Sequence, residues 1–270
     1  QKLEFYAQDR WYEMATYIST LNGGTRGTFH GGETPTRVDT IDYITIPTQG
    51  NAIDFGDIVS GVLRSTSSCS SNTRSIICAG EDGSTPRVVH LQFITFASTG
   101  DSTDAADLTV GTRGSASLSN QTRGITANGS TPSYPGTVDF YTIASLGNAI
   151  DFGDLNYTST TGMGGGSNAT RAIWWGGADT PGYSNVNTIC FNTIATTGNS
   201  LDFGDVSTNT NSGSAMPDGT RCVMKLGSGS GGNSTTTNKI ESIQFATTGN
   251  ATDFGDSVLQ TYSSSLGSMS

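Results

Sequence analysis

The sequence has little of what metal enzymes, nucleic-acid-binding proteins and membrane proteins depend on. Histidine occurs only twice among 270 residues, as His30 and His90, which is few for metal or general-base chemistry. Lysine and arginine number 13 against 23 acidic residues, and the net charge of −10 argues against the cationic face that nucleic acids bind. No run approaches about 18 consecutive apolar residues, so no membrane span is expected. We therefore expect no cofactor, no nucleic-acid partner and no insertion into a membrane.

Hydrophobic residues are also scarce, at 33% of the chain, and only 13% of the residues are charged. Glycine contributes 36 residues, serine 34 and threonine 41. Such a composition is typical of disordered chains. It also suits a repeated architecture, in which thin units share their cores with their neighbours. The chain is strongly self-similar, and this favours the repeated architecture.

A period of about 49 residues runs through the chain. Each unit begins with Thr-Arg, and these arginines are Arg26, Arg74, Arg123, Arg171 and Arg221. A glycine follows each of them six residues later, as Gly32, Gly80, Gly129, Gly177 and Gly227. Each unit also carries a second block, which reads ATTGNATDFGD in the fifth copy and occupies 47–57, 97–107, 144–154, 195–205 and 246–256. The predicted repeats are 26–73, 74–122, 123–170, 171–220 and 221–270.

Each repeat predicts three or four short strands and no long helix. The apolar run after the arginine is typical of a buried strand, and the later alternating segment, such as IDYITI, is typical of a strand with one buried face. The Gly-Asn step of the second block predicts a turn, and a weak Ser/Thr-rich strand precedes the next Thr-Arg. Repeat 2 has Ala105-Ala106 in place of Phe-Gly, so its outer strand is expected to differ locally.

Repeats of this length with about four strands each predict an all-β fold, a five-bladed β-propeller in a single domain spanning 1–270. The alternatives are a six-bladed propeller and a fragment of a longer repeat array. The segments 14–25 and 257–270 both align with the weak strand, so the chain has one copy more of it than of the other elements. We therefore expect 1–25 to supply N-terminal strands that close the ring.

The repeated charges predict contacts between blades. The second aspartate of each block lies 16 or 17 residues before the next repeat's arginine. The arginine fork suits a bidentate carboxylate contact, so each of the five arginines is predicted to pair with one of Asp57, Asp107, Asp154, Asp205 and Asp256. Asp256 would close the ring onto Arg26. The alternative is one Ca²⁺ site per Asp-x-x-Asp, but two carboxylates are few ligands for that ion.

Candidate ligand-binding residues are aromatic. Tyr134 and Tyr183 fall in variable loops near Trp174-Trp175, where exposed rings flanked by polar side chains would suit a sugar or a protein partner. The alternative is that the tryptophans fill the core. His30 occupies a variable position four residues after the arginine, where it either points toward the propeller channel or packs ordinarily. No catalytic residue or metal ligand is identified.

The four cysteines allow two interpretations. Outside the cell they could form two disulfides, whereas in a reducing cytoplasm they would remain free, partly buried thiols. The residues concerned are Cys69, Cys78, Cys190 and Cys222.

Two resemblances extend these expectations. The Gly-Gly steps at Gly31-Gly32 and Gly176-Gly177, each followed by an alternating strand and a turn, resemble the kelch repeat. The phrases TRxxxxxG, IDYITI and ATTGNATDFGD are similar to repeats of virion and tail-fibre proteins of marine tailed phages, especially cyanophages, over nearly the whole chain from Arg26. This resemblance implies a propeller-like virion or host-contact protein.

The expected function is therefore a non-enzymatic structural or tail-fibre module on the surface of a phage particle. Its partners would be other virion proteins or a glycan or protein of the host surface. The alternative is a multivalent lectin with sites on or between the blades, since five repeats favour multivalency.

Overall fold

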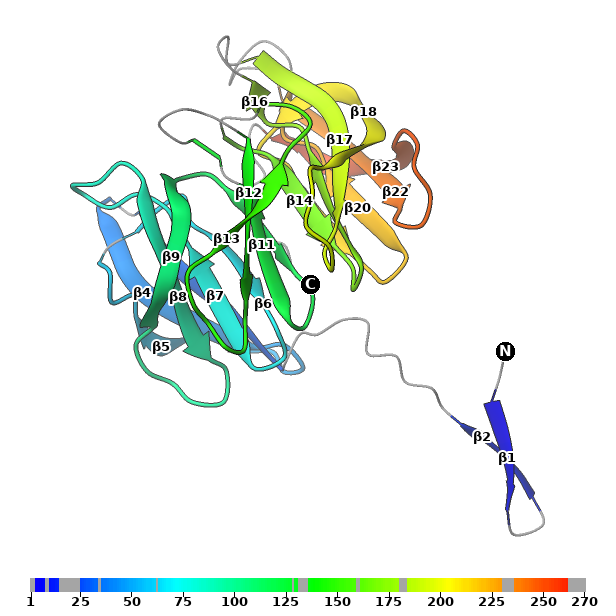
Figure 1. The fold of residues 1–270 in the computed structure, drawn as a ribbon, viewed down its shortest axis with the longest axis horizontal. Helices are drawn as coiled ribbons and strands as arrows, with labels where there is room; N and C mark the ends of the chain where they lie inside the picture. Colours follow the sequence, from blue (N-terminus) through cyan, green and yellow to red (C-terminus); the bar gives the residue numbers. More distant parts are fainter. Residues whose placement is uncertain are drawn as a thin grey trace.

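The computed structural model describes residues 3–7, 10–14, 25–33, 35–61, 63–127, 129–130, 136–158, 161–179, 184–229 and 236–261. These residues form an all-β structure without helices, in which five antiparallel blades are arranged as a five-bladed β-propeller (Figure 1). The fold class predicted from the repeat period is confirmed. In the described part of the chain no helix is long and apolar enough to cross a membrane.

Each complete blade is a meander of four strands paired in chain order. The second blade contains β6 (Ser67–Ser70), β7 (Arg74–Cys78), β8 (Val88–Thr95) and β9 (Thr103–Thr112). The third contains β10 (Ala116–Ser119), β11 (Arg123–Ala127), β12 (Thr137–Thr142) and β13 (Ile150–Asp154). The fourth contains β14 (Gly164–Ser167), β15 (Arg171–Trp175), β17 (Ser184–Thr193) and β18 (Leu201–Asn211). Short β16 (Ala178–Asp179) pairs with the start of β17, and short β21 (Ser228–Gly229) pairs with the end of β18. The fifth contains β19 (Ser214–Pro217), β20 (Arg221–Lys225), β22 (Thr237–Gln244) and β23 (Thr252–Thr261).

The first blade shows three strands among the described residues: β3 (Arg26–Glu33), β4 (Arg37–Thr45) and β5 (Ile53–Asp57). Residues 15–24, which include most of the extra copy of the weak strand, lie outside the described residues. β1 (Leu3–Ala7) and β2 (Arg10–Met14) pair with each other in a separate two-stranded sheet, which lies away from the blades in Figure 1. Ring closure by 1–25 therefore stays a prediction, and the described strands of that segment pair with each other instead of with a blade.

The weak Ser/Thr/Gly-rich strand pairs with the arginine strand that follows it, so each structural blade begins one strand before the Thr-Arg boundary. These weak strands also contact each other from blade to blade: β6 contacts β10, β10 contacts β14, and β14 contacts β19. Because blades converge toward the axis of a propeller, we place these strands, and not the arginine strands, at its inner edge. Their small side chains permit this close approach, as in the hydrogen bonds of Ser67 Oγ to Ser115 and Ser117.

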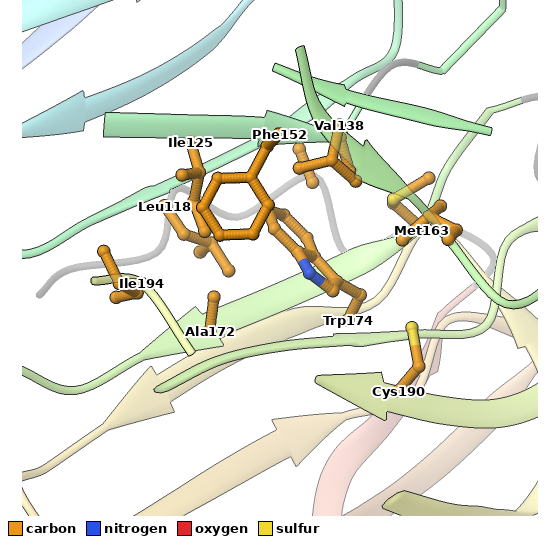
Figure 2. Packing of buried hydrophobic residues seen from close by; sticks show 12 residues of the cluster. Leu118, Ile125, Val138, Phe152, Met163, Ala172, Trp174, Cys190 and Ile194 are labelled. Atoms are coloured by element: carbon orange, nitrogen blue, oxygen red, sulfur yellow. The ribbon is translucent and has the colours of Figure 1, made fainter. Parts of the chain in front are cut away.

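Among the described residues the hydrophobic core is divided into four clusters, one between each pair of successive blades. Figure 2 shows the cluster between the third and fourth blades, where Leu118, Ile125 and Phe152 gather around Trp174. A single blade therefore has no core of its own. This explains how 33% hydrophobic content suffices, since only the two flat faces of each blade need to be apolar.

The Phe-Gly-Asp segment of each outer strand packs its backbone against the turn of the next blade. Gly153 has φ 139°, and a Cβ placed on it would lie 2.6 Å from the carbonyl carbon of Gly198. Gly204 stands in the same relation to Gly249. The N–H of Gly198 donates to the carbonyl of Phe152 at 2.7 Å, so strand and turn are joined directly. Only glycine allows this approach at a positive φ.

Repeat 2 breaks this pattern with Ala105-Ala106, and the structural change falls on the following turn. Leu146 of the third blade adopts a left-handed φ of 58°, and its N–H bonds to the carbonyl of Thr142 in the same blade. The bond from Ala149 N–H to the carbonyl of Asp107 still joins the two blades. The third blade's turn has therefore rearranged to accept a neighbour that carries a Cβ.

Candidate functional site: the two end faces

The repeated arginines join successive blades, but their partners differ from the prediction. Each of the first four donates from Nη1 to a backbone carbonyl of the next blade: Arg26 to Phe96, Arg74 to Ile143, Arg123 to Ile194 and Arg171 to Phe245, at 2.5–3.0 Å. The same guanidinium groups stack on aromatic rings of their own blades, 4.5–4.8 Å from the ring centroids of Tyr43, Phe93, Phe140 and Phe191. The predicted salt bridges to aspartate are wrong for these four arginines, because ring and carbonyl occupy the guanidinium.

The aspartates meet the next blade through their backbone instead. The N–H of Asp154 donates to Oδ1 of Asn199 at 3.0 Å, and the same bond recurs at the other three junctions. The carboxylates remain near solvent, and the pKa of Asp57 is raised by desolvation and by the charges of Asp39 and Asp101. Such a shift is the opposite of what a guanidinium partner would produce. Within the described ranges, no group of three or more His, Cys, Asp or Glu side chains could hold a metal ion.

The two candidate tryptophans are interior residues. Both are fully buried, and because they are consecutive on β15 their rings lie on opposite faces of the fourth blade. Trp174 belongs to the cluster with the third blade and donates from Nε1 to Asn192 Oδ1 at 2.9 Å, whereas Trp175 belongs to the cluster with the fifth. In this structure neither ring is exposed to stack on a ligand. The alternative interpretation, that the tryptophans fill the core, describes their positions. Tyr134 and Tyr183 lie outside the described residues.

His30 is a packing residue in the first blade rather than part of a polar site. It pairs across β3 and β4 with Ile41, and its Nε2 is enclosed without a hydrogen-bond partner among the described atoms. Desolvation by burial lowers its pKa from 6.5 to about 4. The equivalent positions Cys78, Ala127, Trp175 and Lys225 are buried, whereas the His30 residue as a whole is half-buried. The imidazole is therefore neutral at physiological pH.

All four cysteines are free and buried. The Sγ atoms of Cys69 and Cys78 lie 3.2 and 3.0 Å from the hydroxyl of Tyr141, which comes from the next blade. The pKa values of Cys190 and Cys222 are both raised to about 12, mainly by burial. These two thiols are therefore protonated and unreactive at neutral pH.

A charge cluster that sequence reasoning missed lies at the ends of β3 and β4 and on the loops next to the second blade. Glu81 is buried, and Arg37, Arg64 and Arg113 all contact its carboxylate, with Arg64 also reaching Glu33. Burial alone would raise the pKa of Glu81, but the hydrogen bonds from Arg113 and Arg64 outweigh it and lower the pKa. None of these residues belongs to the repeat motif, so no period marked them. The cluster neutralises one buried carboxylate and has a structural explanation.

The fifth blade exposes the face that other blades bury. We call Met216, Arg221, Phe254 and Gly255 the forward end face. Phe254 is 53% exposed, whereas its counterparts Phe55, Phe152 and Phe203 are each 3% exposed because the next blade covers them. Met216 is 60% exposed, and a Cβ on Gly255 would meet no atom within 4 Å. Arg221 is exposed and bonds to the side-chain amide oxygen of Gln244 in its own blade.

The first blade exposes the opposite face in the same way. We call Phe29, Asp42, Ile46, Gly50 and Asn51 the rear end face. Ile46 is 49% exposed, whereas its counterparts Ile143 and Ile194 are 1% and 0% exposed. Phe29, which corresponds to the fully buried Trp174, is 57% exposed. Figure 1 shows β4 and β5 at one end of the row of blades and β22 and β23 at the other.

The molecule thus presents two apolar surfaces that are normally interior in this architecture, and such surfaces mark interaction sites. The two end faces consist of apolar side chains, one guanidinium, one carboxylate and a turn. Compared with known protein families, the chain matches no family model, and it matches none of the curated proteins either.

Proposed function

We propose that the protein is a non-enzymatic structural module of a phage virion or tail fibre, contacting neighbouring virion subunits or the host surface. The observation that carries the proposal is the pair of exposed end faces. Each one leaves a phenylalanine more than half exposed, whereas the phenylalanines equivalent to Phe254 and the internal residues equivalent to Phe29 are almost fully buried. Burying apolar side chains of this kind against another protein is favourable in free energy.

Three further features support this role. The repeat phrases resemble those of tailed-phage virion proteins, and the acidic surface suits an assembly protein more than a nucleic-acid-binding one. The thin blades have Ser, Thr and Gly at the inner edge, and their described residues include few exposed apolar side chains apart from the two end faces and the outer rim.

The lectin alternative has lost part of its basis. It needs exposed ring faces, and Trp174 and Trp175 provide none. A glycan-array screen separates the two functions: a lectin would bind one monosaccharide with several equivalent sites per chain, whereas the structural module would show no such uniform binding.

The proposed function is tested by locating the protein. Antibodies against the purified chain should label intact phage particles in electron microscopy, and its peptides should be present in gradient-purified particles at a stoichiometry comparable with other structural proteins. A protein found only in infected-cell lysate, and never on particles, would overturn the proposal.

A further inference from the structure

We propose that the forward end face of one molecule binds the rear end face of a second copy of this chain, head to tail, with the contacts that join the blades inside each molecule. This inference rests on the proposed function as an assembly module and names the partner. The forward and rear end faces are the two halves of one junction that the chain makes four times internally.

The first set of matching contacts is at the outer strand. In three of the four internal junctions a phenylalanine carbonyl accepts from a turn glycine at 2.7 Å, and the next aspartate N–H donates to the turn's Asn or Asp side chain. Phe254, Gly255 and Asp256 supply the first half of this arrangement. Gly50 and Asn51 supply the second half, and both are exposed.

The second set lies nearer the middle of the blade. Ile46 corresponds to the residues whose carbonyls accept from the preceding arginine, and Arg221 is the one repeat arginine facing no further blade. Asp42 corresponds to Gln92, Asp139 and Glu241, whose side chains accept an N–H from the preceding blade. Val258 stands at the position of the donors Thr109 and Ser207. The Arg221 guanidinium and the Val258 N–H of the forward end face thus match the Ile46 carbonyl and the Asp42 carboxylate of the rear end face.

Two positions of the fifth blade differ from the internal pattern. Ser257 replaces the buried Ile58, Leu108, Leu155 and Val206, and it bonds within its own blade to the carbonyl of Asn238. Ser242 replaces the aromatic residue on which the other arginines stack. The junction between copies therefore buries less apolar area than an internal one, and we expect it to be reversible.

The geometry of such a contact is heterologous, because different surfaces of the two copies meet. Heterologous contacts close into a ring when the rotation per copy divides a full turn, and otherwise produce an open helical filament. In either case every copy uses both end faces except at the ends of an open assembly.

A cross-linking experiment tests the contact directly. Asn51→Cys and Asp256→Cys place thiols at positions whose internal equivalents, such as Asn199 and Asp154, are joined by a 3.0 Å bond between side chain and backbone. Under mild oxidation, a mixture of the two single variants should form covalent dimers about tenfold faster than either variant alone. The native thiols are buried and are present in every sample.

The double variant Asp154→Cys/Asn199→Cys is the matched positive control, since it should cross-link within one chain and show that the geometry permits a disulfide. The double variant Asn51→Cys/Asp256→Cys then discriminates between occupants. Covalent oligomers that grow with protein concentration support a second copy. A cross-link within single chains at high dilution would mean that the molecule closes on its own first blade, and no cross-link at all would mean that the faces do not meet; both results overturn the proposal.

Sedimentation velocity provides a measurement without cysteines. Phe254→Asp and Ile46→Asp should each raise the dissociation constant of self-association by at least about tenfold. Ile150→Asp is the control, because Ile150 is 60% exposed on an internal blade. Equal association of all three variants, or a wild-type protein that stays monomeric at high concentration, would contradict the head-to-tail contact. A monomeric protein that is nevertheless found on particles would remove this inference and leave the proposed function standing.

Discussion

At the scale of single residues, the repeat arginine acts as a connector that combines two weak contacts. In the third blade, Arg123 lies 4.5 Å from the ring centroid of Phe140 and donates to the carbonyl of Ile194 in the next blade at 2.9 Å. The ring stacks on the guanidinium, and the carbonyl of the next blade accepts its hydrogen bond. Sequence spacing revealed the connector but not its partner, because a backbone carbonyl carries no residue signature.

Replacing this arginine should therefore destabilise the molecule more where a next blade accepts its hydrogen bond than where no next blade follows. We expect Arg123→Ala to lower the free energy of unfolding by about 2 kcal/mol, since it removes a charged hydrogen bond and a cation–π contact. Arg221→Ala is the matched control and should cost less than about 0.5 kcal/mol, because its exposed guanidinium bonds to the exposed Gln244 of its own blade and not to a next blade. Urea denaturation of both monomeric variants measures the difference. Equal losses would show that the contact with the next blade contributes nothing.

His30 gives the molecule a specific dependence on pH. Its pKa in the folded state is lowered to about 4 from 6.5, so the unfolded chain binds the proton more readily. Stability is therefore unaffected above pH 6.5 and is lost as the pH falls from 6.5 toward 4, by at most about 3 kcal/mol.

His30→Gln should remove this part of the pH dependence. The measurement is the unfolding free energy of wild type and variant between pH 7.5 and pH 4.5. The difference between the two proteins is compared at each pH, because the contribution of the carboxylates is the same in both and cancels. His90→Gln is the control and should keep the fall. If the wild type and His30→Gln curves ran parallel, the imidazole would have to be protonated, or exposed, in the folded state.

At the scale of strands and turns, close backbone contact decides which residue is tolerated. Gly153 and Gly255 occupy the same place in β13 and β23, and both have positive φ, at 139° and 144°. They differ only in their surroundings: a Cβ on Gly153 would collide with the backbone of Gly198, and one on Gly255 would meet nothing.

The pair Gly153→Ala and Gly255→Ala separates the two costs. Gly255→Ala should lose about 1 kcal/mol through its backbone conformation alone. Gly153→Ala should lose at least about 3 kcal/mol, because the fourth blade must also move away. Thermal unfolding of both variants is the measurement. Similar melting temperatures would mean that the junction adapts freely, as the third blade's turn has done around Ala106.

The charge cluster on the inter-blade loops gives a second test at this scale. Glu81→Gln leaves the guanidinium groups of Arg37, Arg64 and Arg113 close together without their shared carboxylate. We expect a loss of about 3 kcal/mol in unfolding free energy, the order found when a buried ion pair loses one partner. Glu33→Gln is the control and should cost less than about 1 kcal/mol, since its side chain is 40% exposed. Equal losses in the two variants would show that the buried carboxylate of Glu81 contributes no more to stability than the exposed one of Glu33.

At the scale of the whole molecule, the period of the chain predicted the five blades because every blade must present the same pair of faces to its neighbours. It could not predict that the weak strand begins the blade, since pairing partners are chosen by hydrogen bonding across space and not by order along the repeat. For the tryptophans at 174 and 175 the sequence left both the ligand-binding and the core interpretation open, for a related reason. A ring next to a variable loop is exposed or buried according to the position of the neighbouring blade, which one repeat alone does not reveal.

The exposed end faces were not predicted from the sequence, because the extra copy of the weak strand indicated that residues 1–25 close the ring. Their exposure follows from dividing the core among junctions. In the part of the chain that the structure describes, five blades with four clusters leave two faces without one. The stability of such an array is approximately a sum over units and junctions. The second, third and fourth blades are held on both faces, whereas the first and fifth are held on one.

Amide hydrogen exchange of the monomer should therefore show a gradient along the chain. We expect the arginine strands β11 and β15 to exchange only through global opening, and β3 and β20 to exchange about tenfold or more faster through detachment of an end blade. Gly153→Ala should shift the weakest point to the middle and raise exchange in β11 and β15. Uniform protection from β3 to β20 would show that the end blades are held on both faces after all.

A rise in protein concentration should increase the protection of β3 and β20 alone. A second copy covers the two end faces, and no other blade gains a neighbour.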